Sequence, residues 1–180
     1  DYSMVDIGSG PPPPAPVGQN ALVNPLLQTP DGSGANPYCW AQSGFGTNTP
    51  TWSWSPTGGQ TGGQETITMT SWTDGDAKLT QPFDSGNCAP TVVSGDKYSI
   101  SLYYKSTVPV FITIYTRTTS GTWGYWTQSA SFPASSDWTQ ATFTTADIPA
   151  GVNGLSFGMT IAGTGTLSTS NYSLVDTGTH

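Results

Sequence analysis

Charged side chains are scarce in this sequence, and basic ones are scarcest. They make up 8% of the chain, with four Lys and Arg against eleven Asp and Glu, for a formal net charge of −7. Proteins that bind nucleic acids or anionic membranes use several cations to displace counterions from phosphate groups. The shortage of Lys and Arg therefore argues against both kinds of partner.

Long apolar segments and a leader are missing as well. No apolar run approaches the ~20 residues that a transmembrane helix needs. The sequence starts at Asp1 without a signal peptide, so we expect that any leader has been cleaved or cut away. Low charge, many Ser and Thr and a proline-rich stretch are typical of an extracellular chain, and we expect a secreted protein.

Side chains that carry catalysis are equally few. Glu65 is the sole Glu and His180 the sole His. A glycosidase needs two carboxylates that face one bond, and no such pair stands out, because several Asp residues lie in turn-like settings such as Asp31-Gly32. A single terminal His argues against Ser/His/Asp and Cys/His triads and most zinc chemistry. We expect a binding module with no catalytic residues.

Cys39 and Cys88 are the only cysteines, and they form no CxxC motif. A zinc or redox site is therefore not indicated. In a secreted chain the pair predicts a disulfide, worth about 4 kcal/mol in the chain-entropy model. The alternative is two buried thiols in a cytosolic protein, and the extracellular composition favours the disulfide.

Helical patterns are absent, and strand patterns are abundant. Segments such as YSISLYY (98–104) and VFITIYTR (110–117) alternate with a period of two. We predict one all-β domain, a β-sandwich or jelly roll of about 8–10 antiparallel strands, with a closed up-and-down barrel as the weaker alternative. The predicted strands are residues 21–27, 50–55, 65–72, 77–82, 97–105, 109–118, 122–129, 139–144, 154–161 and 166–175.

The two ends of the chain resemble each other. DYSMVDIGSG at residues 1–10 matches NYSLVDTGTH at residues 171–180 in unbroken register. We interpret residues 1–10 as the tail of a preceding, similar module, residues 11–18 as a proline-rich linker and residues 19–178 as the main module. The alternative is that residues 1–7 join the main sheet as an extra strand.

Several short motifs, in their order and spacing, carry a family resemblance. The chain resembles the carbohydrate-binding jelly rolls of the CenC-like group, and more closely the modules appended to bacterial polysaccharide deacetylases and other polysaccharide-active enzymes. The resemblance implies a β-sandwich with a concave sugar-binding face that holds an attached enzyme at its substrate. The motifs are Asn24-Pro25, Cys39-Trp40, Gly44 to Asn48, Gly75-Asp76, Lys78-Leu79, Gly95 to Tyr98, Tyr104 to Thr107, Trp126, Trp138, Ser156 to Gly158 and Tyr172 to Asp176.

The resemblance also implies a structural calcium ion, held between the first and last strands. The matching positions are Gln28 and Asn171, and neither carries the charge that a hard cation prefers. Asp74 and Asp76 are other candidate ligands, but an Asp-Gly turn explains them equally well. The sequence therefore requires no cofactor.

The candidate binding face centres on a predicted hairpin. Sugars stack their apolar faces on aromatic rings, and a two-residue turn at Ser120-Gly121 would set Tyr115 opposite Trp126 as platforms. The same register sets Thr113 opposite Gln128 and Arg117 opposite Gly124. The predicted carbohydrate-binding residues are Tyr115, Trp126, Tyr103, Lys105, Arg117, Gln128, Trp72 and Trp54.

Neighbouring segments complete this prediction. In residues 98–105 the alternation turns Tyr103 and Lys105 away from the core, and in residues 154–161 it leaves Ser156, Gly158 and Thr160 as a low floor with room for a ligand. Each aromatic has the alternative of a place in the core, which we favour for Trp40 and Trp138. Alternation alone does not place Trp52 or Trp54.

The net charge of −7 bears on the ligand, because it would repel polyanions such as pectin. We therefore expect a neutral or N-acetylated polysaccharide. The second class of function is an extracellular adhesin or matrix-contact module that binds protein. Aromatic side chains that line a groove would favour sugar, and a flat patch rimmed by charge would favour protein.

Overall fold

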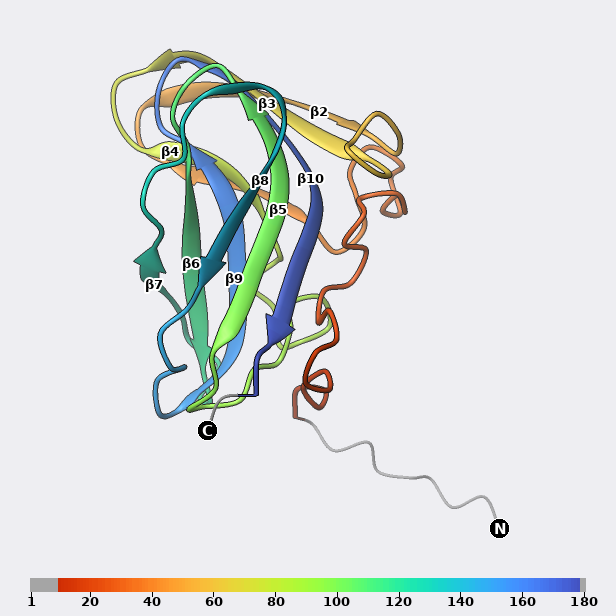
Figure 1. Cartoon of the computed structure of the whole chain (residues 1–180), viewed down its shortest axis with the longest axis vertical. Coiled ribbons are helices and arrows are strands. Elements are labelled where there is room, and N and C mark those ends of the chain that lie inside the picture. Colours follow the sequence, from red (N-terminus) through yellow and green to blue (C-terminus); the bar gives the residue numbers. More distant parts are fainter. Residues whose placement is uncertain (1–9, 179–180) are drawn as a thin grey trace.

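The computed structural model describes residues 10–178, which form ten β-strands and no helix (Figure 1). No helix within this range is therefore long and apolar enough to cross a membrane. The predicted tail of a preceding module, residues 1–10, lies outside the described residues except for Gly10. His180 lies outside them too.

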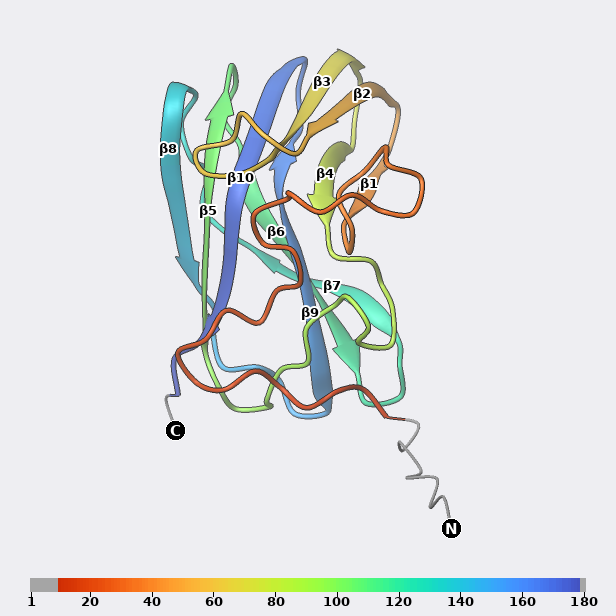
Figure 2. The ribbon, with the colours of Figure 1, turned by 90° about the vertical axis from the view of Figure 1, so that its right-hand side faces the viewer.

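The strands form two antiparallel sheets of five, which confirms the predicted all-β sandwich. Figure 2 shows the sheets as two layers. One sheet has the order β1 (Ala41–Phe45), β4 (Asp76–Thr80), β9 (Val152–Ile161), β6 (Phe111–Thr118) and β7 (Trp123–Gln128). The other has the order β2 (Asn48–Ser55), β3 (Gln64–Trp72), β10 (Gly165–Asp176), β5 (Tyr98–Ser106) and β8 (Ser135–Thr144).

Alternating side chains from both sheets form the core. Ile112 and Ile114 of β6 and Phe157 of β9 are fully buried on one side, and Ile100 and Leu102 of β5 are fully buried on the other. Burial of this apolar surface is the main favourable contribution to folding. The period-two pattern in the sequence correctly assigned these positions to the interior.

One strand prediction was wrong, and one strand was missed. Residues 21–27 form turns instead of a strand: Asn24 and Leu27 have φ angles of 52° and 53°, and Asn24 Oδ1 accepts hydrogen bonds from the Gln28 and Thr29 backbone. Turn chemistry from one Asn side chain thus outweighs the apolar residues around it. Conversely, β1 was not predicted, because its sequence AQSGF has no apolar alternation.

The predicted disulfide is present. Cys39 and Cys88 are joined, with their Cα atoms 5.0 Å apart. The bond ties the N-terminal segment to the loop of residues 81–91 that follows β4. The proline-rich residues cross the lower end of the sandwich in Figure 2, where Pro12 packs against Gly86, and the Gly18 backbone donates to Asp176.

Candidate functional site

The hairpin of β6 and β7 has a three-residue loop, so the predicted two-residue turn was wrong. The Thr118 amide donates to the Thr122 carbonyl at 2.9 Å, and Gly121 adopts a φ of 89°. A glycine in this left-handed region is typical of three-residue hairpin loops. The resulting register sets Arg117 opposite Trp123, where we expected Gly124, and Tyr115 opposite Tyr125, where we expected Trp126.

A β-bulge then restores the predicted register further along. Trp126 is the extra residue, since Tyr115 pairs with Tyr125 whereas Ile114 pairs with Thr127. Thr113 pairs with Gln128 as predicted. The bulge separates two neighbouring rings: Trp126 packs against the core, and Tyr125 is 60% exposed.

A hollow of about 490 Å³ opens on the outer surface of the β1–β4–β9–β6–β7 sheet. We call this surface the aromatic face, because the rings of Phe45, Phe111, Tyr115 and Tyr125 contribute to the hollow. Phe45 is 67% exposed. The lining residues are Phe45, Gly75, Asp76, Phe111, Thr113, Tyr115, Tyr125, Gln128 and Ala162.

Further rings extend the aromatic face toward the hairpin loop. Phe83 lies 4.9 Å from Trp123, stacked, and 5.0 Å from Tyr115, tilted, measured between ring centroids. Tyr115 meets Tyr125 edge-on at 6.2 Å. Such pairs contribute about 0.5–1.5 kcal/mol each beyond their buried area, so the rings hold one another in place.

The loop that carries Phe83 is held by Asp84. The Asp84 carboxylate accepts hydrogen bonds from the backbone amides of Gly86, Cys88 and Ala89, and its carbonyl accepts from Trp123 Nε1 at 3.1 Å. The loop is therefore tied both to β7 and, through Cys88, to the disulfide.

Arg117 lies on the same face but is buried. Its guanidinium donates to the Asn153 side chain, the Asn153 carbonyl and the Asp84 carbonyl at 3.0–3.1 Å. Burial lowers the pKa of the guanidinium, and the Asp84 carboxylate opposes this shift. The Arg117 hydrogen bonds connect strands and loops of the protein itself, so Arg117 supports the aromatic face from below.

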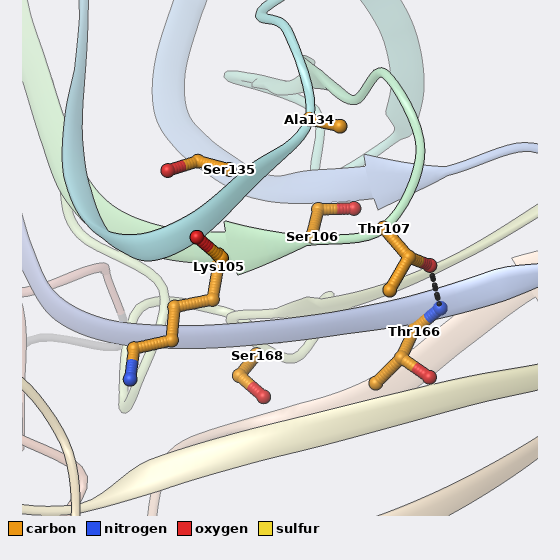
Figure 3. A pocket seen from close by; sticks show the side chains of 8 residues that line it. Lys105, Ser106, Thr107, Ala134, Ser135, Thr166 and Ser168 are labelled. Carbon is orange, nitrogen blue, oxygen red and sulfur yellow. Dashed lines mark hydrogen bonds between the residues drawn. The ribbon is translucent and has the colours of Figure 1, made fainter.

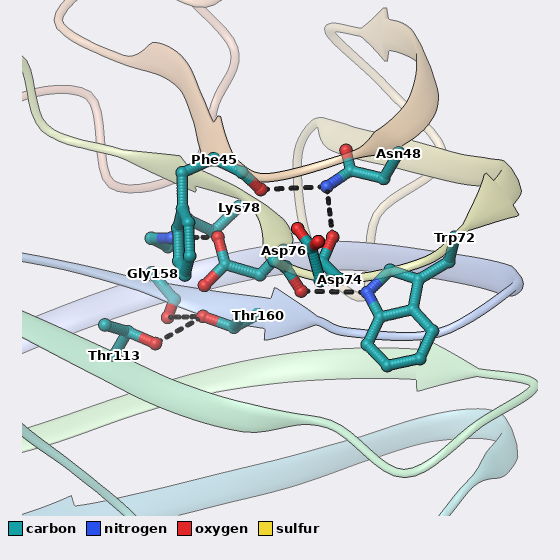
Figure 4. Close-up of polar contacts among 10 residues, drawn as sticks. Phe45, Asn48, Trp72, Asp74, Asp76, Lys78, Thr113, Gly158 and Thr160 are labelled. Carbon is teal, nitrogen blue, oxygen red and sulfur yellow. Dashed lines mark hydrogen bonds and ion pairs between the residues drawn. The ribbon is translucent and has the colours of Figure 1, made fainter.

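The predicted floor of β9 lies beneath this face, but it leaves no room. Ser156, Gly158 and Thr160 are buried. The Thr160 hydroxyl is hydrogen-bonded to that of Thr113 at 2.7 Å, and Lys78 of β4 pairs with Thr160 across the sheet (Figure 4). Side chains already fill the space above the floor, and the hollow lies beside it.

Tyr103 and Lys105 lie on the opposite side of the molecule. Their strand, β5, runs between β10 and β8. We expected it beside β6, which belongs to the other sheet. Lys105 Nζ lies 4.9 Å from the Trp138 ring centroid, which places Trp138 on this outer surface instead of in the core. A hollow of about 340 Å³ lies beside Lys105 and is lined largely by Ser and Thr. Figure 3 shows the side chains that line it.

The remaining tryptophans divide between surface and interior. Trp72 is half-exposed at the end of β3, where its Nε1 donates to the Gly75 carbonyl. Trp54 and Trp52 pack against the core, and Trp54 Nε1 donates to the Leu27 carbonyl. Trp40 is buried as predicted. We call the hollow of about 490 Å³ on the aromatic face the main hollow. Of the eight predicted binding residues, Tyr115 and Gln128 line it.

Sequence reasoning missed Phe45, Phe83, Phe111 and Tyr125. Phe45 follows a segment that lacked strand signals, and Phe83 lies in a loop, where no alternation assigns a face. Phe111 could have been found from the alternation of β6, because it lies four residues before Tyr115 and its side chain is therefore on the same face of the strand.

The positions that the family resemblance suggested for calcium lie around residues 58–63. Asn171 Nδ2 donates to Gln60 Oε1 at 3.0 Å, and Gln28 approaches Gly62. Asp74 accepts from the Thr47 amide, and Asp76 pairs with Lys78. Within residues 10–178 no three His, Cys, Asp or Glu side chains gather as a metal site. Amide oxygens alone fit calcium poorly.

Comparison with solved structures shows likeness to carbohydrate-binding modules. The xylan-binding CBM22-1 domain of Paenibacillus barcinonensis Xyn10C has 14% identity over 92% of this chain and 99% of its own, with a TM-score of 0.58. A family 11 module from Clostridium thermocellum, in complex with a β-1,3-1,4-mixed-linked tetrasaccharide, has 16% identity, coverages of 77% and 89% and a TM-score of 0.50. At these identities the likeness shows the fold.

Enzymes contain similar domains. This chain spans 21% of a tailspike enzyme from bacteriophage CBA120, at 14% identity, 87% coverage of this chain and a TM-score of 0.63. It spans 27% of an arabinose-bound α-L-arabinofuranosidase, at 18% identity, 89% coverage and a TM-score of 0.62. No family profile and no curated protein matches the sequence. The chain has the β-sandwich fold of carbohydrate-binding modules.

Proposed function

We propose that this chain is a non-catalytic carbohydrate-binding module that docks an attached enzyme onto a neutral or N-acetylated polysaccharide outside the cell. The ligand lies in the main hollow of the aromatic face. Tyr125, Phe45 and Tyr115 provide stacking surfaces, and Gln128 offers hydrogen bonds at the edge. In this proposal residues 1–10 end a preceding module of the same polypeptide.

The observation that carries the proposal is a hollow lined by exposed rings with few charges. Phe45 and Tyr125 are 67% and 60% exposed, although burial of such rings is favourable. Asp76 is the single charged residue among the lining residues. An aromatic groove with scattered polar groups fits a sugar chain better than it fits the protein partner of an adhesin.

Catalysis receives no support from the hollow. Glycosidases place two carboxyl groups about 5–10 Å apart across the scissile bond. Among residues 10–178, Asp76 is the only carboxylate that lines the hollow, and it is paired with Lys78. Glu65 points into the core, where it is fully buried.

The proposal is tested by calorimetric titration with three neutral oligosaccharides: the β-1,3-1,4-mixed-linked tetrasaccharide, xylohexaose and β-1,4-galactotriose. The tetrasaccharide and the galactotriose are ligands in solved complexes of similar modules, and xylohexaose is a ligand in a complex of a CBM22-1 module joined to the GH10 module of a xylanase. Tyr125→Ala should weaken binding about ten-fold, since a stacking contact contributes about 1–2 kcal/mol. The fold should survive, because the ring is largely exposed.

Tyr103→Ala is the matched control, because it removes the same side chain from the opposite face. Its affinity should equal that of the parent. If Tyr103→Ala loses binding and Tyr125→Ala keeps it, the ligand lies on the β5 face and our assignment is wrong. If the parent binds none of the three oligosaccharides, none of their parent polysaccharides and no N-acetylglucosamine oligomer, the carbohydrate-binding function itself is contradicted.

A further inference from the structure

An ion pair lies beneath the rings at one end of the main hollow. Lys78 Nζ donates to Asp76 Oδ1, and the two residues are 1% and 7% exposed (Figure 4). Phe45 is the cross-strand partner of Asp76 in the β1–β4 register. The ammonium lies 5.8 Å from the Phe45 ring centroid and 5.6 Å from that of Tyr115. The cation is thus enclosed by one carboxylate and two rings.

One oxygen of the Asp76 carboxylate remains available. Within residues 10–178, Lys78 is the only hydrogen-bond partner of this side chain, and it uses Oδ1. Asp76 nevertheless lines the main hollow and a neighbouring hollow of about 370 Å³ on the other side of Phe45. Carboxylate oxygens in buried settings normally accept hydrogen bonds, and those bonds are among the stronger ones in proteins. Oδ2 is therefore an acceptor in need of a donor.

We propose that Asp76 Oδ2 accepts a hydrogen bond from a hydroxyl of the bound sugar, and that Lys78 is the positioning residue that neutralises and orients the carboxylate. This inference rests on the proposed function. A pyranose stacked on Phe45 or Tyr125 presents its hydroxyls around its rim, where Asp76 lies. The subsite therefore selects a neutral sugar with a free hydroxyl at this position, and it disfavours a uronate, whose carboxylate would face that of Asp76.

The test replaces both members of the pair, because removal of one would leave a buried unpaired charge. An Asp76→Leu, Lys78→Met double variant should fold, since apolar replacement of a whole buried ion pair is often neutral. Thermal melting checks the fold. For whichever of the three oligosaccharides the parent binds most tightly, affinity should fall about ten-fold or more.

A scan with monodeoxy derivatives of that oligosaccharide separates recognition from a structural effect. If Asp76 accepts one hydroxyl, removal of that hydroxyl weakens binding to the parent about ten-fold and leaves binding to the double variant unchanged. A merely structural pair would give the same deoxy profile in both proteins, and that result overturns the inference. Should the double variant fail to fold, Asp76→Ala with Lys78→Met takes its place in the same scan, because neither new side chain can accept a hydrogen bond from the hydroxyl.

The outcomes also distinguish this inference from the proposed function. If Tyr125→Ala loses affinity and the double variant binds like the parent, the sugar lies on the aromatic face without contact to Asp76, and only the inference falls. If the parent binds no polysaccharide, the proposed function and the role of Asp76 fall together.

Discussion

Phe83 lies almost parallel to Trp123, with 12° between the ring planes and 4.9 Å between the centroids. Phe83 comes from the loop after β4, whereas Trp123 begins β7. This contact joins a loop to the sheet edge, and it extends the aromatic face beyond the main hollow.

Phe83→Ala should weaken polysaccharide binding, because Phe83 supports Tyr115 and Trp123 and is itself 47% exposed. We expect a loss of about three- to ten-fold, with a fall in unfolding free energy near 1 kcal/mol. Tyr38→Ala is the control, since Tyr38 is also 47% exposed but makes no ring contact with Tyr115 or Trp123. Equal affinity of the two variants would remove Phe83 from the binding surface.

Trp126→Ala should act on stability more than on binding. Trp126 packs against the core, so its truncation should lower the unfolding free energy by about 3 kcal/mol or more. Chemical denaturation of Trp126→Ala and Tyr125→Ala side by side provides the measurement. Similar stabilities for the two variants would contradict the placement of these neighbouring rings on opposite faces.

Glu65→Gln should change how stability depends on pH. Burial raises the pKa of Glu65 from 4.5 to about 7, against a smaller opposing effect of the Ser53 backbone. The folded state then holds a proton that the unfolded state releases above about pH 4.5. Stability from this group is present at low pH and is lost as pH rises through 7, by up to about 3 kcal/mol.

Denaturation between pH 4.5 and pH 8 checks this expectation. Glu65→Gln should match the parent near pH 4.5 and exceed it at pH 8, because the amide stays neutral. A parent that is as stable at pH 8 as at pH 4.5, with the variant unchanged, would show that Glu65 ionises freely.

Loss of the Cys39–Cys88 disulfide should reduce both stability and binding. A Cys39→Ala, Cys88→Ala variant should lose about 2–4 kcal/mol of unfolding free energy. It should also bind more weakly, because Cys88 holds the loop that presents Phe83. Mass spectrometry of the parent without reductant should show two protons fewer than the reduced mass. An unchanged affinity in the variant would mean that Asp84 alone fixes the loop.

Much of the fold could be predicted from period-two alternation, which assigned the inward residues of β5, β6 and β9 correctly. Alternation could not assign strands to sheets. It shows on which face of β5 the Tyr103 side chain lies, but it does not show which strands lie beside β5. Tyr103 and Lys105 were therefore expected beside Tyr115, whereas they lie on the other sheet.

The binding surface depended on finer details of the backbone. The partner of Tyr115 depends on one residue of loop length and on one bulge, neither of which leaves a clear pattern in the sequence. A one-residue change in register turns every following side chain to the other face. The Ser120-Gly121 signal located the loop correctly, but it did not give its length.

The loop of residues 119–121 therefore controls which ring meets a ligand. If the same residues turned over a two-residue loop at Ser120-Gly121, with Thr119 opposite Thr122, Trp126 would lie opposite Tyr115, and the pairing of Thr113 with Gln128 would need no bulge. The wider indole would be displayed, and the phenol of Tyr125 would turn inward. Chains with this fold could therefore exchange a small stacking surface for a large one through a change of loop type, without substitution of any residue that touches the sugar.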